Sequence, residues 1–576
     1  MAGGSPYADP AFLAKLARRT RMNYESMAVF AGAITGLFCL FTISHLVRRV
    51  GAELGASRRP NIVTAFFRNI RAASLQEFLG LPSGTHLIII TAYLAINLII
   101  TFTNLDNTNM PLLSNLASRT GWMAIANLLV VIFLSLKNTP LAILTASSYE
   151  RLNIFHRVAG YTTLVFVIVH SCSYAALFGS QGAIKRLTER DEIFGMVASG
   201  SFLVLVFAGA VVRTWWYELF YYLHVTFWLL AIIMTGLHQP EPSKKIIYAT
   251  CVAAGIWGLE RLIRLIRLAV NSTNNSATLT PLPNGGTRVK LAKSPLGSAS
   301  GKHGFLWIPA IRAAETHPFT MVATDPLEFV VAAHDGFTQT LHKYAEQNPG
   351  TQLKASVEGP YGAFPDAREY DKVVLVAGGS GASFTVGAAL DMLKKLRDDE
   401  EKEVLFIWMI KNQTYLPWFS HHLKTLQGDR RVKVKVYVTR ASAAEIGTQS
   451  PPLPSDSSLS GTLVGSHPEK EPLPQLTVTR LSLDTEKEGF SSPVESPVSP
   501  SIESKSEPTS DIPIMYGRPD VAFLVCEAVQ GVSADKRVLV MGCGPRTLIS
   551  TVRNSTAGCI ADNGPSVELH CEQFGW

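Results

Sequence analysis

Seven apolar stretches in the first half of this 576-residue chain restrict its fold more than any other feature. They lie at residues 27–47, 86–104, 121–136, 155–177, 193–212, 217–238 and 246–268. Each approaches the roughly 20 apolar residues that a helix needs to cross a bilayer. The sequence therefore predicts an all-α transmembrane bundle in its first half.

The charge distribution agrees with a membrane protein. The formal net charge of +7 does not indicate nucleic-acid binding, because the basic residues concentrate near the ends of the apolar segments. The seven cysteines are scattered without a CxxC motif, so neither a thiolate metal site nor a disulfide framework is expected. Residues 1–27 lack a cleavable signal pattern, so the first apolar run would itself serve as the membrane signal.

Loop charges predict the orientation of the bundle. The arginine-rich loop at 48–71, the loop at 137–157 and the region after 268 are expected in the cytoplasm, with the N-terminus outside. Two basic groups on the predicted outer side oppose this orientation: Lys15, Arg18, Arg19 and Arg21, and Lys185, Arg186 and Arg190.

Two of the apolar segments each carry a pair of histidines fourteen residues apart: His156 and His170, and His224 and His238. On a helix this spacing places both rings on nearly the same face, about 21 Å apart. Two parallel helices would then set His156 opposite His224 and His170 opposite His238. A lone intramembrane histidine is as often a helix–helix hydrogen-bonding group as a metal ligand. Two pairs with equal spacing instead favour two haem irons, each held by two imidazoles.

Three arginines at the level of His156 and His224 are candidate partners for haem propionates or ordinary interfacial anchors: Arg151, Arg157 and Arg213.

The second half predicts two nucleotide-related domains. Short strands such as 287–292 and 327–333, separated by polar turns, are compatible with a small antiparallel barrel. A buried strand at 372–377 then leads into a glycine turn and a helix, which is an arrangement that presents backbone N–H groups to a pyrophosphate. A second strand at 538–541 also ends in a glycine turn, which favours a Rossmann-like α/β domain.

These boundaries divide the chain into four parts. Residues 1–85 form a tail, the first span and a basic loop, and residues 86–268 form a six-helix domain. A barrel domain at 269–366 precedes an α/β domain at 367–576. The Ser/Pro-rich stretch at about 441–511 cannot bury a core and is predicted to be a disordered insert.

Besides the two histidine pairs, five motifs stand out: Tyr149 to Arg157, His317-Pro318-Phe319-Thr320, Gly378-Gly379-Ser380-Gly381, Gly542-Cys543-Gly544-Pro545 and Glu572 to Trp576. On these residues the chain, from about residue 86 onward, resembles the fungal ferric-chelate (metallo)reductases, in the superfamily that includes the NADPH oxidases. The resemblance implies a haem-binding bundle followed by a cytoplasmic ferredoxin-reductase-like module. That module would combine an FAD-binding β-barrel with an NADPH-binding α/β domain.

The resemblance also implies roles for individual residues. FAD would be bound by the His317–Thr320 motif, with Thr320 near the isoalloxazine, and its phosphates by Gly336, Phe337 and Thr338. NADPH would be bound by the Gly378–Gly381 and Gly542–Pro545 turns, with Cys543 beside the nicotinamide. Arg518 and, second, Arg440 are candidates for the 2′-phosphate, and Phe574 or Trp576 would cover the flavin. One departure is that His334 stands where a basic partner of the flavin phosphate is expected before Gly336, which predicts a lower flavin affinity.

The implied activity is electron transfer from cytosolic NADPH through FAD and two b-type haems to chelated Fe³⁺ on the far side, with Cu²⁺ as a second acceptor. The protein would supply positioning while the cofactors supply the redox chemistry, so no acid–base or nucleophilic catalytic residue is expected. The alternatives are an NADPH oxidase that makes superoxide from O₂, and a haem-binding membrane scaffold without turnover. The plasma membrane is expected, with vacuolar or other organelle membranes left open, and a metal permease or oxidase is the expected downstream partner.

Overall fold

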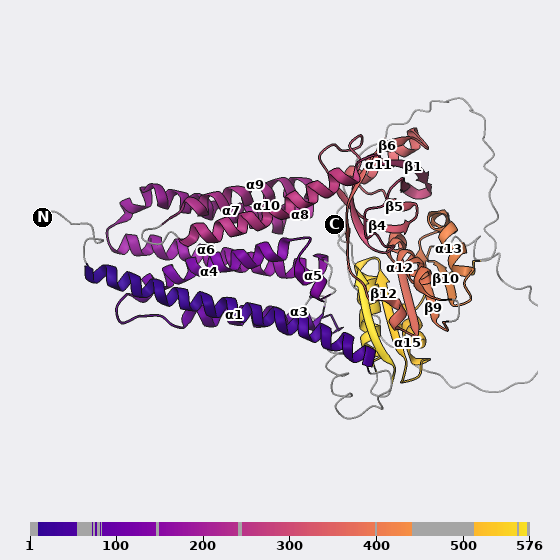
Figure 1. The fold of residues 1–576 in the computed structure, drawn as a ribbon, viewed down its shortest axis with the longest axis horizontal. Coiled ribbons are helices and arrows are strands. Elements are labelled where there is room, and N and C mark those ends of the chain that lie inside the picture. Colours follow the sequence, from indigo (N-terminus) through magenta and orange to yellow (C-terminus); the bar gives the residue numbers. More distant parts are fainter. Residues whose placement is uncertain are drawn as a thin grey trace, which may run out of the picture. The chain divides into compact units, whose positions relative to one another are not determined.

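The computed structural model describes residues 10–54, 72, 75–77, 81, 83–145, 149–239, 245–397, 400–440, 512–560 and 564–572. The predicted insert at 441–511, together with Phe574 and Trp576, lies outside these residues. Figure 1 shows helices throughout the first half of the chain, and strands in the second half.

Seven helical segments in the described part of the chain are long and apolar enough to cross a membrane, which confirms the predicted number. They are built from α1 (Pro10–Leu54), α3 (Gly84–Phe102), α4 (Leu112–Ser135), α6 (Tyr149–Ser180), α7 (Arg190–Phe207), α9 (Tyr217–Leu237) and α10 (Lys245–Asn271). A π-turn at Ala208–Val212 and the short α8 (Arg213–Trp215) extend α7. The third span is longer than predicted, because polar residues that open α4, such as Asn115 and Arg119, are buried within the protein.

Three described basic residues that oppose the predicted orientation are already paired near the N-terminal end of α1. Arg18 contacts Asp106, Arg19 donates to the Ser114 hydroxyl, and Arg21 contacts Glu25. The orientation rule counts basic residues whatever their partners, so these charges still oppose the predicted orientation, which stays a prediction.

The first domain after the bundle is an antiparallel seven-stranded sheet, in the order β6-β1-β2-β5-β4-β3-β7. Its strands are β1 (Ser276–Leu282), β2 (Gly286–Leu291), β3 (His303–Trp307), β4 (His317–Thr324), β5 (Leu327–Ala332), β6 (Gln352–Lys354) and β7 (Ser356–Tyr361). Only Ala355 separates the two edge strands β6 and β7 in the chain, so the sheet curls on itself as a barrel does. Helix α11 (Gly336–Gln347) packs Phe337, Leu341 and Ala345 into its core.

The last domain is a parallel six-stranded sheet in the order β11-β10-β9-β8-β12-β13. Its strands are β8 (Lys372–Gly378), β9 (Glu403–Ile410), β10 (Val432–Val438), β11 (Ile514–Tyr516), β12 (Arg537–Cys543) and β13 (Ser566–Glu572). Its main helices are α12 (Ala382–Lys395), α13 (Ser420–Gln427), α15 (Val521–Gln530) and α16 (Arg546–Gly558). The strand order reverses between β8 and β12, so the crevice at their carboxyl ends is where a nucleotide is expected.

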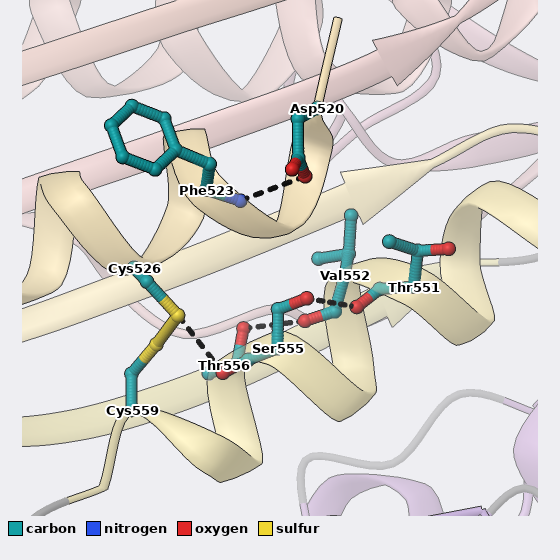
Figure 2. Close-up of a disulfide and its surroundings, with 8 residues drawn as sticks. All are labelled: Asp520, Phe523, Cys526, Thr551, Val552, Ser555, Thr556 and Cys559. Carbon is teal, nitrogen blue, oxygen red and sulfur yellow. Dashed lines mark hydrogen bonds between the residues drawn. A yellow bond between two sulfur atoms is a disulfide. The ribbon is translucent and has the colours of Figure 1, made fainter. Parts of the chain in front are cut away.

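The cysteines depart from the prediction, since one disulfide joins Cys526 on α15 to Cys559 at the end of α16 (Figure 2). The two residues are 33 positions apart in the sequence. They meet because both helices pack on the core of the parallel sheet, through residues such as Val525 and Val552. No local cysteine spacing could have indicated this contact.

Candidate functional site

The structure brings His156, His170, His224 and His238 together in the two predicted pairs. The ring centres of His156 and His224 lie 6.4 Å apart, and those of His170 and His238 lie 6.3 Å apart. A metal–imidazole bond is about 2.0 Å long and the ring centre lies roughly 1.2 Å beyond the nitrogen, so two imidazoles on opposite sides of one iron have centres about 6.4 Å apart. Both pairs therefore have the separation that bis-imidazole ligation requires.

The second nitrogen of each of these rings is already used. The Nδ1–H groups donate to backbone carbonyls: His156 to Val131 (3.0 Å), His170 to Ala117 (2.7 Å), His224 to Leu205 (3.2 Å) and His238 to Asp191 (2.8 Å). Because a carbonyl can only accept, each ring carries its proton on Nδ1 and presents an unprotonated Nε2. This arrangement is the usual orientation of a metal-binding imidazole.

Two glycines make room for the rings of the second pair. A β-carbon on Gly121 of α4 would lie 2.6 Å from the His170 ring, and one on Gly195 of α7 would lie 2.9 Å from the His238 ring. Any larger residue at either position would displace the imidazole. Nothing in the local sequence indicated these two contacts, because they join different helices.

A cavity surrounds the first pair, and four basic residues are among those that line it. Arg157 and Arg213, which the sequence indicated, line it together with Lys137 and Arg261, which the sequence analysis missed. The side chain of Arg151 lies outside the described residues. Burial, followed by the nearby Arg264 charge, holds the pKa of the Lys137 ammonium well below its usual value. A carboxylate entering this cavity would meet several cationic side chains, which suits the propionates of a haem.

The donor set also fits a haem better than a bare ion. Among the residues that the structure describes, no cluster of three or more His, Cys, Asp or Glu side chains could hold a metal ion. Two imidazoles are sufficient only when a macrocycle supplies the remaining ligands. The paired histidines, their carbonyl contacts and the surrounding cavity are thus compatible with haem at His156/His224. The same ring geometry is repeated at His170/His238.

The predicted flavin motif lies beside the start of α11. The His317 ring on β4 stacks on Phe337, with ring centres 4.2 Å apart. The ring centres of Phe319 and Phe337 lie 6.2 Å apart. Burial lowers the pKa of His317, so it is neutral at pH 7. Gly336 opens the helix with a φ of +53°, a conformation that favours glycine.

The predicted phosphate-binding end of this motif is the turn that leads into α11. The Thr338 hydroxyl accepts the His334 N–H at 3.0 Å and donates to the Asp335 carbonyl, so it shapes the turn before α11. The N-terminus of α11 supplies the backbone N–H groups that suit a phosphate. Pro318 and Thr320 pair with Phe305 and His303 of β3, which places the whole motif along one strand.

The two glycine turns of the α/β domain touch each other. A β-carbon on Gly381 would lie 2.4 Å from the Cys543 carbonyl oxygen, and one on Gly378 would lie 2.9 Å from Pro545. Gly544 has a φ of +157°, and a β-carbon on it would lie 3.0 Å from the Gly378 nitrogen. The Gly378-Gly379-Ser380-Gly381 and Gly542-Cys543-Gly544-Pro545 turns therefore form one surface at the carboxyl ends of β8 and β12.

Cys543 is buried, and a residue that the sequence analysis gave no role lies opposite it. Glu572 pairs with Cys543 across β12 and β13, and His570 contacts the Glu572 carboxylate at 2.8 Å. Burial, followed by the Glu572 charge, raises the pKa of the Cys543 thiol, so it is uncharged at pH 7. Glu572 is the last residue of β13 and opens the terminal motif, and an acidic residue at the start of that motif was the signal that could have indicated it.

Three exposed basic residues follow neighbouring strands of the same sheet: Lys411 after β9, Arg440 after β10 and Arg518 after β11. Because the strands are parallel, all three side chains start from the same edge of the sheet as the glycine turns. Lys411 was missed by the sequence analysis, although it directly follows β9, whereas Arg440 is the second residue after β10.

Comparison with known proteins gives three protein-family matches along the chain. Residues 120–235 match the profile described as ferric reductase like transmembrane component. Residues 274–364 match an FAD-binding domain, and residues 370–557 match a ferric reductase NAD binding domain. The order of the three matches is the order of the bundle, the barrel and the parallel sheet.

Curated relatives include fungal membrane reductases. Ferric/cupric reductase transmembrane component 2 of Schizosaccharomyces pombe is 27% identical over 56% of this chain and 66% of its own length. Ferric/cupric reductase transmembrane component 1 of Candida albicans is 25% identical, over 80% and 57% respectively. Ferric reductase transmembrane component 4 of Saccharomyces cerevisiae is also 25% identical, over 80% and 62%. The chain thus spans about two thirds of these relatives' length or less.

Proposed function

Because the chain belongs to the fungal ferric reductase family, we propose that it is an NADPH-dependent transmembrane reductase of chelated Fe³⁺ and Cu²⁺. Electrons would pass from NADPH through FAD and two b-type haems to an acceptor on the opposite side of the membrane. The observation that carries this proposal is the presence of two stacked imidazole pairs, each with the separation of a bis-ligated iron.

Each haem, when bound, would supply a one-electron carrier. The residues of the chain set its position. The backbone carbonyls that accept from Nδ1 hold each imidazole in the tautomer that binds iron. The cationic side chains that line the first cavity would bind the haem propionates, and the glycine turns at β8 and β12 would bind the pyrophosphate of NADPH.

An acceptor assay tests the proposed activity. Membranes bearing the protein are supplied with NADPH and either a ferric chelate or air, and Fe²⁺ and superoxide are followed separately. We expect Fe²⁺ to form at least tenfold faster than superoxide at saturating chelate. If superoxide forms faster than Fe²⁺, and superoxide dismutase abolishes the Fe²⁺ signal, the protein is an oxidase and the reductase proposal fails. A haem-binding scaffold would show neither product.

The basic residues at the sheet edge predict a preference for NADPH over NADH. Replacing Arg518 with alanine removes a charge-assisted contact to the 2′-phosphate, and such contacts contribute about 1.5–3 kcal/mol. We therefore expect the KM for NADPH to rise about tenfold or more while the KM for NADH stays within twofold. Arg440→Ala should also raise the KM for NADPH. Arg397→Ala, an exposed arginine beyond α12, is the control and should change neither KM. An equal rise for both nucleotides would contradict this assignment.

The cellular setting completes the proposal. The seven span-forming helices make the chain a multi-pass membrane protein. We propose the plasma membrane as its location and metal uptake as its role, with a metal permease or oxidase receiving the reduced ion. The NADPH-binding domain would lie in the cytoplasm.

A further inference from the structure

We propose that Cys526 and Cys559 form a reversible thiol–disulfide couple that adjusts the binding of NADPH. This inference rests on the proposed NADPH site and adds a modification site to it. In the structure the two sulfur atoms are bonded, and they link α15 to α16 (Figure 2).

The position of the bond connects it to the nucleotide site. The closed ring of chain from Cys526 to Cys559 contains all of β12, the Gly542–Pro545 turn and α16. Helix α16 begins directly after Pro545, and α15 begins shortly after Arg518, where Asp520 accepts the Phe523 N–H (Figure 2). Both helices precede a strand of the parallel sheet, so both start at its nucleotide-binding edge. The disulfide therefore restrains the two helices whose N-terminal ends follow the segments that would contact the nicotinamide and the 2′-phosphate.

The surroundings of the bond accommodate both oxidation states. The Cys526 sulfur lies 3.7 Å from the Ser555 carbonyl oxygen, which would accept a hydrogen bond from the thiol after reduction. Apolar contacts through Val525 and Val552 hold the helices together without the covalent link. Reduction should thus loosen the unit without unfolding the domain.

Access to the bond is selective. Cys526 is partly exposed, whereas Cys559 is 5% exposed, so an attacking thiolate reaches the Cys526 sulfur first. The other two cysteines of the described α/β domain, Cys543 and Cys571, are buried. The remaining described cysteines lie on membrane-spanning helices: Cys39, Cys172 and Cys251.

The chemistry balances with a small-molecule disulfide as the oxidant. The Cys526 thiolate attacks one of its sulfurs, forms a mixed disulfide and releases one small thiol. The Cys559 thiolate then displaces the second small thiol, so two electrons and two protons leave the protein. Excess small thiol reverses both steps. Because cytosolic thiol pools keep most cysteines reduced, the bond would form when that pool becomes oxidised.

A restrained turn loses less freedom when it binds a ligand, so the oxidised form should bind NADPH more tightly. We expect the KM for NADPH to be about threefold lower in the oxidised than in the reduced full-length protein, with kcat changed by less than twofold. Differential alkylation and mass spectrometry, at set ratios of reduced to oxidised glutathione, measure the oxidation state of each cysteine. NADPH-driven flavin reduction in the same samples gives KM.

Matched variants separate the possible outcomes. The Cys526→Ser and Cys559→Ser variants should keep the KM of the reduced form under both conditions, whereas a Cys39→Ser/Cys172→Ser/Cys251→Ser variant should still respond. The proposal is overturned if the pair stays fully bonded or fully free across the glutathione range, or if KM is the same in both states. If neither state shows saturable reduction by NADPH, the NADPH site itself fails, which is a different result.

Discussion

Replacing His170 with alanine should reduce the haem content from two to one per chain and lower Fe³⁺-chelate reduction more than 100-fold. The variant removes one of the two imidazoles that would hold the second haem and leaves His156 and His224 untouched. Flavin reduction by NADPH should continue at the normal rate, because the nucleotide turns are in another domain. Haem is counted by the pyridine haemochrome spectrum of purified protein, and flavin reduction by stopped-flow absorbance.

The matched control is His86→Ala. His86 is also a histidine of a membrane-spanning helix, but its Nδ1 bonds to Ser83 and its ring stacks on Phe155. It should retain two haems. Two haems and normal Fe³⁺ reduction in His170→Ala would show that the second pair does not bind haem.

Replacing Arg119 with methionine should destabilise the bundle more than any other single change on the same helix end. Its guanidinium is fully buried and donates to Asn23 and to the carbonyls of Ile100, Thr103 and Asn104. These carbonyls belong to the last turn of α3 and the residues after it, so Arg119 satisfies groups that the helix leaves unpaired. Removing the guanidinium leaves several buried acceptors without a donor, and each unsatisfied group costs about 1–3 kcal/mol. We expect the thermal aggregation midpoint in detergent to fall by roughly 10 °C.

Arg18→Ala provides the comparison for this variant. Arg18 is close by but its side chain is 63% exposed and contacts only Asp106 among the ion pairs described, and exposed pairs contribute about 0–1 kcal/mol. Its midpoint should shift by less than 2 °C. Equal shifts in the two variants would contradict the assigned role of Arg119.

Periodicity and composition predicted much of this architecture. Runs of apolar residues gave the number of spans, and the glycine turns after buried strands predicted two turns that the structure places against each other. The histidine spacing predicted which rings would face each other, because the helical repeat is fixed by backbone hydrogen bonds. The length of α4 was underestimated, since Asn115 and Arg119 are polar yet buried by partners distant in sequence.

The sequence by itself determined the seven apolar segments, the pairing of His156 with His224 and of His170 with His238, and the order of the barrel and the parallel sheet. These features depend on local backbone geometry and on whether the composition of each segment suits the bilayer or water. Only the tertiary structure decided which carbonyls orient the imidazoles, that Gly121 and Gly195 make room for the second pair, and that Lys137 and Arg261 line the first cavity. The same holds for the Cys526–Cys559 bond, because each of these contacts joins elements whose packing depends on side chains far apart in the chain.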